Sequence, residues 1–174
     1  MMAENPMREI RLGKVVVNIS VGASGEPLQN AMDILEEVTG QKPNHRVAKQ
    51  SIRPWGIRRG EPMACTVTLR KEKADAFLRK ALTAVGHRLK ARSFDRDGNF
   101  AFGIREHIDL PGTRYDPEKG IIGMDVCVSL ERPGYRVARR RRARSKVGHN
   151  HRVTPEEAMR FIVENYNVEV EGRP

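Results

Sequence analysis

Hydrophobic and polar positions alternate along several stretches of the chain, and this alternation predicts β-strands. Residues 14–21 (KVVVNISV) are rich in β-branched residues, and Asn18 interrupts their apolar pattern. A second strand is expected around residues 45–52. The alternation typical of a strand with one buried face recurs in three more stretches, residues 63–70, 100–104 and 122–130.

Three other stretches predict helices. Apolar residues recur at intervals of three and four over residues 28–38 and again over residues 73–85. The first of these helices is expected to end at Gly40. The sequence Thr154-Pro-Glu-Glu157 is a capping box with proline at the first helical position. It predicts a short helix that continues to about Tyr166.

The order of these elements is strand, helix, two strands, helix and further strands, which predicts an α+β fold. Two helices would pack on one face of a mostly antiparallel sheet. We expect a single α+β domain over residues 1–131. Residues 132–174 would form an Arg-rich extension with a C-terminal helix, packed on the same domain.

The second face of the predicted sheet would then be free. Asn18, Thr66 or Thr68 would lie on it, with the polar residues near Gln41 beside it. An open sheet face is where several RNA-binding folds place their contacts. An ordinary solvated face is the alternative for any one of these side chains.

Charge is concentrated in one part of the chain. The 174 residues include 32 Lys and Arg against 22 Asp and Glu, a net charge of +10 that attracts polyanions. Residues 132–152 contain no acidic residue, and the remainder of the chain is close to neutral. The basic residues of this segment are Arg132, Arg136, Arg139, Arg140, Arg141, Arg142, Arg144, Lys146 and Arg152.

The excess of Arg over Lys in this segment favours bidentate and stacking contacts with nucleic acid. The segment has little apolar periodicity, so we expect it to order on RNA or DNA and, if extended, to reach on the order of 70 Å.

A second candidate contact is the loop of residues 50–60, which is rich in Pro and Gly. Trp55, the only tryptophan of the chain, lies there among Arg53, Arg58 and Arg59. An indole ring can stack on a base, and guanidinium groups can bind phosphates. A tryptophan alone is as readily a core residue, but its basic loop favours a functional role.

The sequence offers no catalytic or metal constellation. His149 and His151 form a pair without a cysteine cluster or nearby carboxylate to complete a zinc site. Residues 106–109 (EHID) are expected in a strand, where consecutive residues point to opposite faces, so they would not share a site. Residues 22–25 (GASG) precede a helix and are either a plain turn or a turn that binds a phosphate through its backbone N–H groups. They lack the spacing and the Lys-Ser/Thr ending of a P-loop. We expect no cofactor, no metal and no enzymatic activity.

The remaining composition indicates a cytosolic protein without a membrane segment. No run of 18 apolar residues occurs, and residues 1–7 include Glu4 and Pro6 where a leader would be basic and then apolar. Cys65 and Cys127 are far apart and lie in alternating apolar runs, so both are expected to be core residues.

Eight longer motifs resemble the ribosomal protein L5 family, and they occur in the order of that family over most of residues 7–130. The motifs are VNISVG (17–22), TGQKP (39–43), AKQSI (48–52), IRRGEP (57–62), VTLR (67–70), FDRDGNF (94–100), GIRE (103–106) and YD with GMD (115–116 and 123–125). Residues 132–136 (RPGYR) and 151–159 are similar to the archaeal and eukaryotic branch.

The resemblance implies a structural constituent of the large ribosomal subunit that binds 5S rRNA in the central protuberance. It also implies contacts with the peptidyl-site tRNA, with other large-subunit rRNA and with a small-subunit ribosomal protein at an intersubunit bridge. The protein would be a monomer within the ribosome, in the cytoplasm.

The resemblance and the concentration of basic residues together indicate which residues would touch each RNA. The expected 5S rRNA contacts are Asn18, Gln41, Lys42, Trp55, Thr68 and Arg70. The expected tRNA-facing residues are Arg53, Arg58 and Arg59. Other rRNA would be bound by Arg136, Arg139, Arg140, Arg141, Arg142, Arg144, Lys146 and Arg152. The two alternatives are a chromatin-type nucleic-acid-binding protein and an RNA-modifying enzyme that uses Glu106 and His107.

Overall fold

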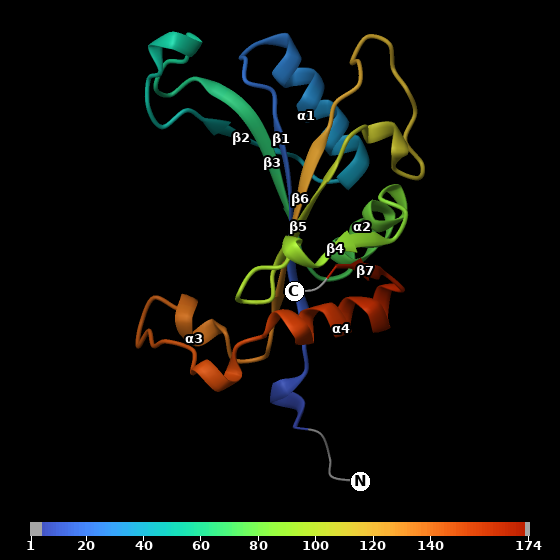
Figure 1. Ribbon diagram of the computed structural model, residues 1–174. Helices are drawn as coiled ribbons and strands as arrows, with labels where there is room; N and C mark the ends of the chain where they lie inside the picture. Colours follow the sequence, from blue (N-terminus) through green and yellow to red (C-terminus); the bar gives the residue numbers. More distant parts are fainter. Residues whose placement is uncertain (1–4, 173–174) are drawn as a thin grey trace.

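A five-stranded antiparallel sheet forms the centre of the computed structural model, which describes residues 5–172 (Figure 1). The strand order is β2-β3-β1-β6-β5, so β1 pairs with both β3 and β6. The strands are β1 (Arg11–Ser20), β2 (Asn44–Val47), β3 (Pro62–Leu69), β5 (Phe100–Ile104) and β6 (Met124–Glu131).

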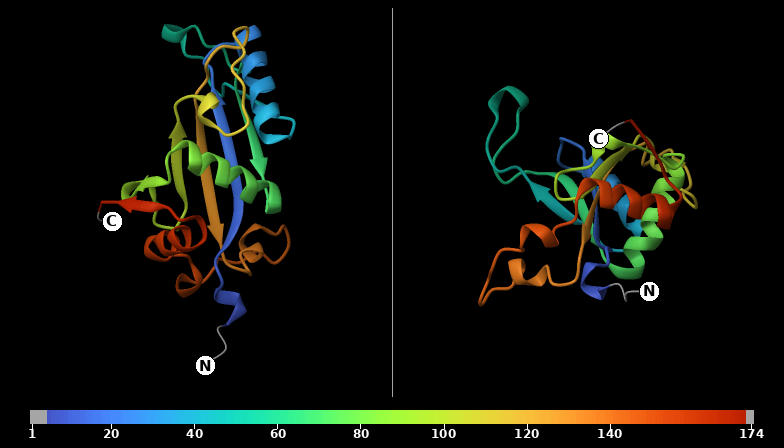
Figure 2. Two further views of the ribbon diagram at one scale, coloured as in Figure 1. Left: turned by 90° about the vertical axis from the view of Figure 1, so that its right-hand side faces the viewer. Right: turned by 60° about the horizontal axis from the view of Figure 1, so that its bottom comes forward.

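Three helices cover one face of this sheet (Figure 2). They are α1 (Glu26–Thr39), α2 (Lys71–Ala84) and α4 (Pro155–Tyr166). A four-residue helix, α3 (Arg136–Arg139), lies apart from them in the Arg-rich segment. Two short strands, β4 (Arg88–Lys90) and β7 (Glu169–Glu171), form a separate parallel pair. The α+β fold class expected from the sequence is confirmed.

The two-residue period of the strands places the core on one side of the sheet. Val15, Val17 and Ile19 of β1 are almost completely buried. They pair in register with Leu69, Val67 and Cys65 of β3, so the same face of both strands meets α1 and α2. The intervening residues of β1 must therefore point to the opposite face.

The helices begin and end near the predicted positions. Gly40 ends α1 in a left-handed conformation (φ 61°), which glycine adopts without steric cost. The capping box that begins α4 is present, because Thr154 accepts from the backbone N–H of Glu157 and the Glu157 side chain accepts from that of Thr154.

A partly buried polar contact fastens α4 to α2. The Tyr166 hydroxyl donates to the Asp75 carboxylate at 2.6 Å, and Arg79 donates to the other oxygen at 3.0 Å. The Arg79 guanidinium also lies 5.1 Å from the centre of the Tyr166 ring. Burial works to raise the pKa of Asp75, but the two hydrogen bonds outweigh it and lower that pKa.

Three sequence predictions about local structure were wrong. The second strand ends at Val47, directly after a shift in its pairing with β3 between Arg46 and Val47. Cys127 is exposed, since it is out of phase with the buried residues Val126 and Val128 of β6. Residues 107–109 form a 3₁₀ turn instead of strand.

Candidate RNA-binding surface

The sheet face opposite the helices, here called the open face, has no helix packed on it in the described part of the chain (Figure 2). Its residues are known from the strand register, because directly paired residues of antiparallel strands share a face. One row crosses all five strands in register, through Asn44, Thr66, Asn18, Asp125 and Gly103.

The neighbouring row of the open face consists of Thr68, Val16, Cys127 and Ala101. Its side chains are short and uncharged, so the central strands present a nearly neutral surface that backbone, base or ribose groups can approach. Burial and the Asp125 carboxylate raise the pKa of Cys127 above its ordinary value, which keeps its thiol protonated near neutral pH.

Three of the predicted contact residues are brought together at this face. Asn18 and Thr68 lie on adjacent strands and are diagonal neighbours, since Thr68 pairs with Val16. Gln41 joins them, because its side-chain amide donates to the backbone carbonyl of Thr68 at 3.3 Å. Arg46 of β2 adds a positive charge at one edge and donates to the Thr66 hydroxyl at 3.0 Å.

Lys42 and Arg70 follow the same two segments of chain, one after Gln41 and the other after β3, and both side chains are exposed. Sequence reasoning did not single out Arg46, whose place beside Thr66 depends on the pairing of β2 with β3.

Trp55 does not lie on the open face. It belongs to the arm, defined here as residues 48–61, which extends past the end of the sheet between β2 and β3 (Figure 1). Trp55 sits in a 3₁₀ turn that ends at Gly56 (φ 68°), and 74% of its surface is exposed. The side chains of Arg53, Arg58 and Arg59 are also exposed on the arm.

Hydrogen bonds give the arm a defined conformation. Ile52 and Ile57 pair across it, and Gly60 donates to the carbonyl of Ala48 at 2.9 Å. The Glu61 carboxylate accepts from the backbone N–H of Arg58 at 3.1 Å and from the hydroxyl of Ser24 at 2.8 Å. These two bonds lower the pKa of Glu61, and they tie the arm to the turn before α1.

The Arg-rich segment folds back on itself (Figure 1). Its base is closed by Tyr135, whose hydroxyl donates to the His151 carbonyl at 3.3 Å and accepts from the Val153 N–H at 2.9 Å. His151 also contacts the Pro133 carbonyl at 2.8 Å and the edge of the Tyr135 ring. His151 is therefore a structural residue.

The basic residues of the segment divide into two groups. Arg132 is 7% exposed and donates to Glu157 at 2.7 Å and to the Arg152 carbonyl, so it holds α4 in place. Arg139 pairs with Glu131, and Arg152 pairs with Asp97. The side chains left exposed without an ion pair within residues 5–172 are those of Arg136, Arg140, Arg141, Arg142, Arg144 and Lys146.

A close approach of Glu131 to Gly13 positions Arg139 in the Arg-rich segment. A side chain at Gly13 would come within 2.8 Å of the Glu131 carboxyl carbon, so glycine lets Glu131 cross β1 to reach Arg139. Gly13 lies at the point where the pairing of β1 with β6 shifts register. The contact of Glu131 with Arg139 therefore depends on the absence of a side chain at Gly13.

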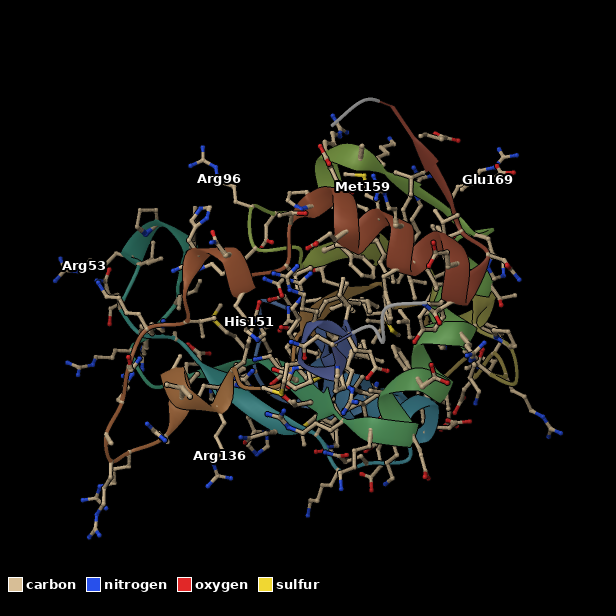
Figure 3. All side chains as sticks on the ribbon, turned by 90° about the horizontal axis from the view of Figure 1, so that it is seen from below. Arg53, Arg96, Arg136, His151, Met159 and Glu169 are labelled. Atoms are coloured by element: carbon tan, nitrogen blue, oxygen red, sulfur yellow. The ribbon has the colours of Figure 1, made fainter. Side chains whose placement is uncertain are left out.

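The open face lies between the arm and the basic loop, defined here as residues 139–148. Both project away from α2 and α4 (Figures 1 and 3). Lys146 of the basic loop and Ser129 of β6 line one hollow of about 360 Å³, which connects the basic loop to the sheet. A neutral platform is thus flanked by two basic projections, the arrangement of a protein that binds nucleic acid.

The groups considered for catalysis do not form a site. His107 is buried, and its Nδ1 accepts from the backbone N–H of Ile122 at 3.3 Å. Over residues 5–172, no three His, Cys, Asp or Glu side chains are grouped closely enough to hold a metal ion. None of the helices in that range is both long and apolar enough to cross a lipid bilayer.

Comparisons with known proteins agree with an RNA-associated, non-enzymatic class. Residues 5–58 match the family described as "Ribosomal protein L5", and residues 62–161 match a second description, that of the C-terminus of the same ribosomal family. The chain belongs to the ribosomal protein L5 family, which is a structural, non-enzymatic one.

Archaeal relatives are similar over nearly the whole chain, and each is a large ribosomal subunit protein uL5. The Sulfurisphaera tokodaii protein is 57% identical over 95% of this chain and 94% of its own length. The Archaeoglobus fulgidus protein is 57% identical over 91% and 89%. The Nitrosopumilus maritimus protein is 44% identical over 96% of each chain.

The buried pair of Arg132 and Glu157 predicts a pH-dependent stability. Burial works to raise the pKa of Glu157, but hydrogen bonds from the Thr154 N–H and the Arg132 guanidinium outweigh it, so the pKa lies below its ordinary 4.5. A lowered pKa in the folded state contributes stability above pH 4.5, and that contribution is lost as the pH falls through the folded-state value.

We expect Glu157→Gln to lower the free energy of unfolding by about 1–2 kcal/mol at pH 7, because the substitution leaves the buried Arg132 without its carboxylate. At pH 3 the gap from the wild type should be narrower than at pH 7, since protonation of the wild-type carboxylate increases as the pH falls. Urea denaturation at both pH values measures it, with Glu164→Gln on the exposed side of α4 as control. A gap of the same size at both pH values would contradict this account.

Proposed function

We propose that this structural constituent of the large ribosomal subunit binds 5S rRNA through its open face and attaches it to the central protuberance, acting as a monomer within the ribosome. The observation that supports this most directly is the in-register pairing of Asn18 with Thr66 and of Thr68 with Val16 on a face that no described helix covers. Gln41 contacts Thr68 beside this face, and the exposed Lys42 and Arg70, next to Gln41 and Leu69 in the chain, are proposed to extend it.

The neutral character of the open face suits selection of one RNA over others. Contacts to phosphate provide affinity without sequence information, whereas hydroxyl and amide groups can recognise the shape and the hydroxyls of an RNA. Asn18 offers both a donor and an acceptor, and Thr68 offers a hydroxyl. We therefore assign specificity to the open face and general affinity to the basic loop.

Substitutions on the open face test the first assignment. Asn18→Ala and Thr68→Val should each weaken binding to isolated 5S rRNA by about 5- to 10-fold, because each removes a hydrogen-bonding group worth about 1 kcal/mol or somewhat more. Filter binding at about 0.2 M salt measures this, with excess duplex DNA present to exclude chromatin-type binding. Thr83→Val and Asn165→Ala, both on exposed helix positions, serve as matched controls. Unchanged affinity in both open-face variants would disprove the assignment.

The basic loop is assigned to neighbouring large-subunit rRNA. Its exposed guanidinium groups can approach phosphates from a segment already folded at its base, so less ordering is needed on binding. Within the described residues, Arg141, Arg142 and Arg144 make neither an ion pair nor a side-chain hydrogen bond, whereas Arg140 donates to the Ala143 carbonyl at 2.8 Å. Arg136, Arg139, Lys146 and Arg152 are proposed to contact the same rRNA.

The salt dependence of binding separates the basic loop from the open face. Replacing Arg141, Arg142 and Arg144 by Gln should make binding to 5S rRNA less dependent on salt. The slope of log affinity against log salt should flatten by up to about 0.9 for each lost duplex phosphate contact. Preference for 5S rRNA over a scrambled RNA of equal length should remain. The same change at Lys73, Lys80 and Arg160, on the helical side, is the control, and an equal loss of slope there would remove the special role of the loop.

The arm is proposed to contact two RNAs, the peptidyl-site tRNA and 5S rRNA. Arg53, Arg58 and Arg59 are proposed to face the peptidyl-site tRNA, while Trp55 is proposed to stack on a base of 5S rRNA. The hydrogen bonds that fix the arm favour such contacts because they reduce the ordering cost of binding. A contact with a small-subunit ribosomal protein at an intersubunit bridge completes the proposal.

Trp55 reports on its own contact, because it is the only tryptophan of the chain. If it stacks on 5S rRNA, its fluorescence should be quenched on titration with that RNA, and Trp55→Ala should weaken binding by roughly 5- to 150-fold, the value of about 1–3 kcal/mol per stacked base. Replacement of Arg58 and Arg59 by Gln should leave that affinity nearly unchanged and reduce tRNA retention on ribosomes that carry the variant. Unchanged fluorescence with 5S rRNA would place Trp55 with the tRNA-facing residues instead.

A further inference from the structure

One carboxylate lies in the middle of the open face, within the two rows of side chains described above, which are otherwise uncharged. Asp125 occupies the row that crosses the sheet, directly between Asn18 on β1 and Gly103 on β5. It is exposed, and no ion pair or side-chain hydrogen bond engages it within the part of the chain that the structure describes. Such a charge at the centre of an RNA-binding face repels phosphate, so it is costly there unless it accepts hydrogen bonds from the RNA.

The surroundings of Asp125 form a hollow that suits a nucleotide. Asn18, Ser20, Gly103, Arg105 and Asp125 line an open hollow of about 380 Å³ where β5 and β6 begin to diverge. Gly103 has no side chain, and a Cβ there would lie 3.6 Å from the Asp125 Oδ1. The carboxylate is therefore accessible from the side of β5.

The hollow combines groups of complementary chemistry. The Asp125 carboxylate only accepts hydrogen bonds, the Asn18 amide both donates and accepts, and the exposed Arg105 carries a positive charge at the rim. A base with two adjacent N–H donors fits the two carboxylate oxygens, and a phosphate of the same strand fits Arg105.

We propose that Asp125 is a specificity-determining residue that accepts hydrogen bonds from the N1–H and N2 amino groups of an unpaired guanine. This rests on the proposed binding of 5S rRNA by the open face. Guanine is the base whose Watson–Crick edge presents two adjacent donors, and RNA loops expose that edge to proteins. Cytosine offers one amino group, and in duplex RNA that group lies in a groove too narrow for a sheet face to enter.

The substitution Asp125→Asn gives opposite outcomes for this role and for a bystander carboxylate. It keeps the size of the side chain and removes its charge. A bystander that only repels RNA would bind more tightly after the change, because repulsion is relieved. A guanine acceptor would lose affinity for 5S rRNA, by roughly 5- to 150-fold for a good bidentate contact. Glu164→Gln on α4 makes the same charge change away from the open face and should leave affinity unchanged or slightly higher.

A modified RNA tests the identity of the base. In a set of 5S rRNAs, each has one unpaired guanine replaced by inosine, which lacks the N2 amino group. At one position inosine should weaken binding of the wild type and cause no further loss with Asp125→Asn, because the two changes remove the same contact. If inosine at every position lowers the affinity of both proteins equally, Asp125 does not contact a guanine. This outcome would overturn a direct contact and also one bridged by a cation or a water molecule.

The outcome is distinguishable from failure of the proposed function itself. If the wild type does not prefer 5S rRNA, the function of the open face is wrong and Asp125 has no guanine to select. If Asn18→Ala and Thr68→Val weaken binding while Asp125→Asn strengthens it, the open face binds 5S rRNA and only the role of Asp125 is refuted. Circular dichroism melting of each variant confirms that the exposed substitutions leave the fold intact.

Discussion

The strict two-residue period of β1, held between β3 and β6, is the constraint on which the rest of the molecule depends. Val15, Val17 and Ile19 supply the apolar contacts for α1 and α2, and burial of each such side chain contributes about 1.5–3 kcal/mol. A shift of one residue would move this whole set to the opposite face. The hydrophobic core therefore fixes which residues the open face presents.

The same constraint explains what the sequence could predict. Alternation and helical spacing indicated the principal elements and the placement of Asn18 with Thr66 or Thr68 on the free face, because these depend on local order along the chain. Val16 and Val17 are identical in type, and only their phase separates a surface residue from a core residue. The prediction of a buried Cys127 was wrong because it rested on the apolar residue type and ignored the position of Cys127 in the alternation of β6.

Contacts between distant segments could not be predicted from pattern. Arg132 and Arg141 look alike within one basic segment, yet the first is buried because Glu157 lies beside it and the second is exposed. The fold of the Arg-rich segment depends on Tyr135 and His151, whose pairing no spacing rule indicates. The short pair of β4 with β7 likewise joins segments about 80 residues apart, and too few residues take part to leave a pattern.

The position of α4 and β7 affects how the chain can fold while it is being made. Tyr166 and Val168 belong to the hydrophobic core, and β7 pairs with β4 beside them. All five strands of the sheet lie within residues 11–131, but until α4 follows, the side of α2 that Tyr166 contacts lacks this cover. Folding thus ends only after synthesis has passed Val168, and the nascent chain passes through an aggregation-prone stage that its positive charge helps to keep dispersed.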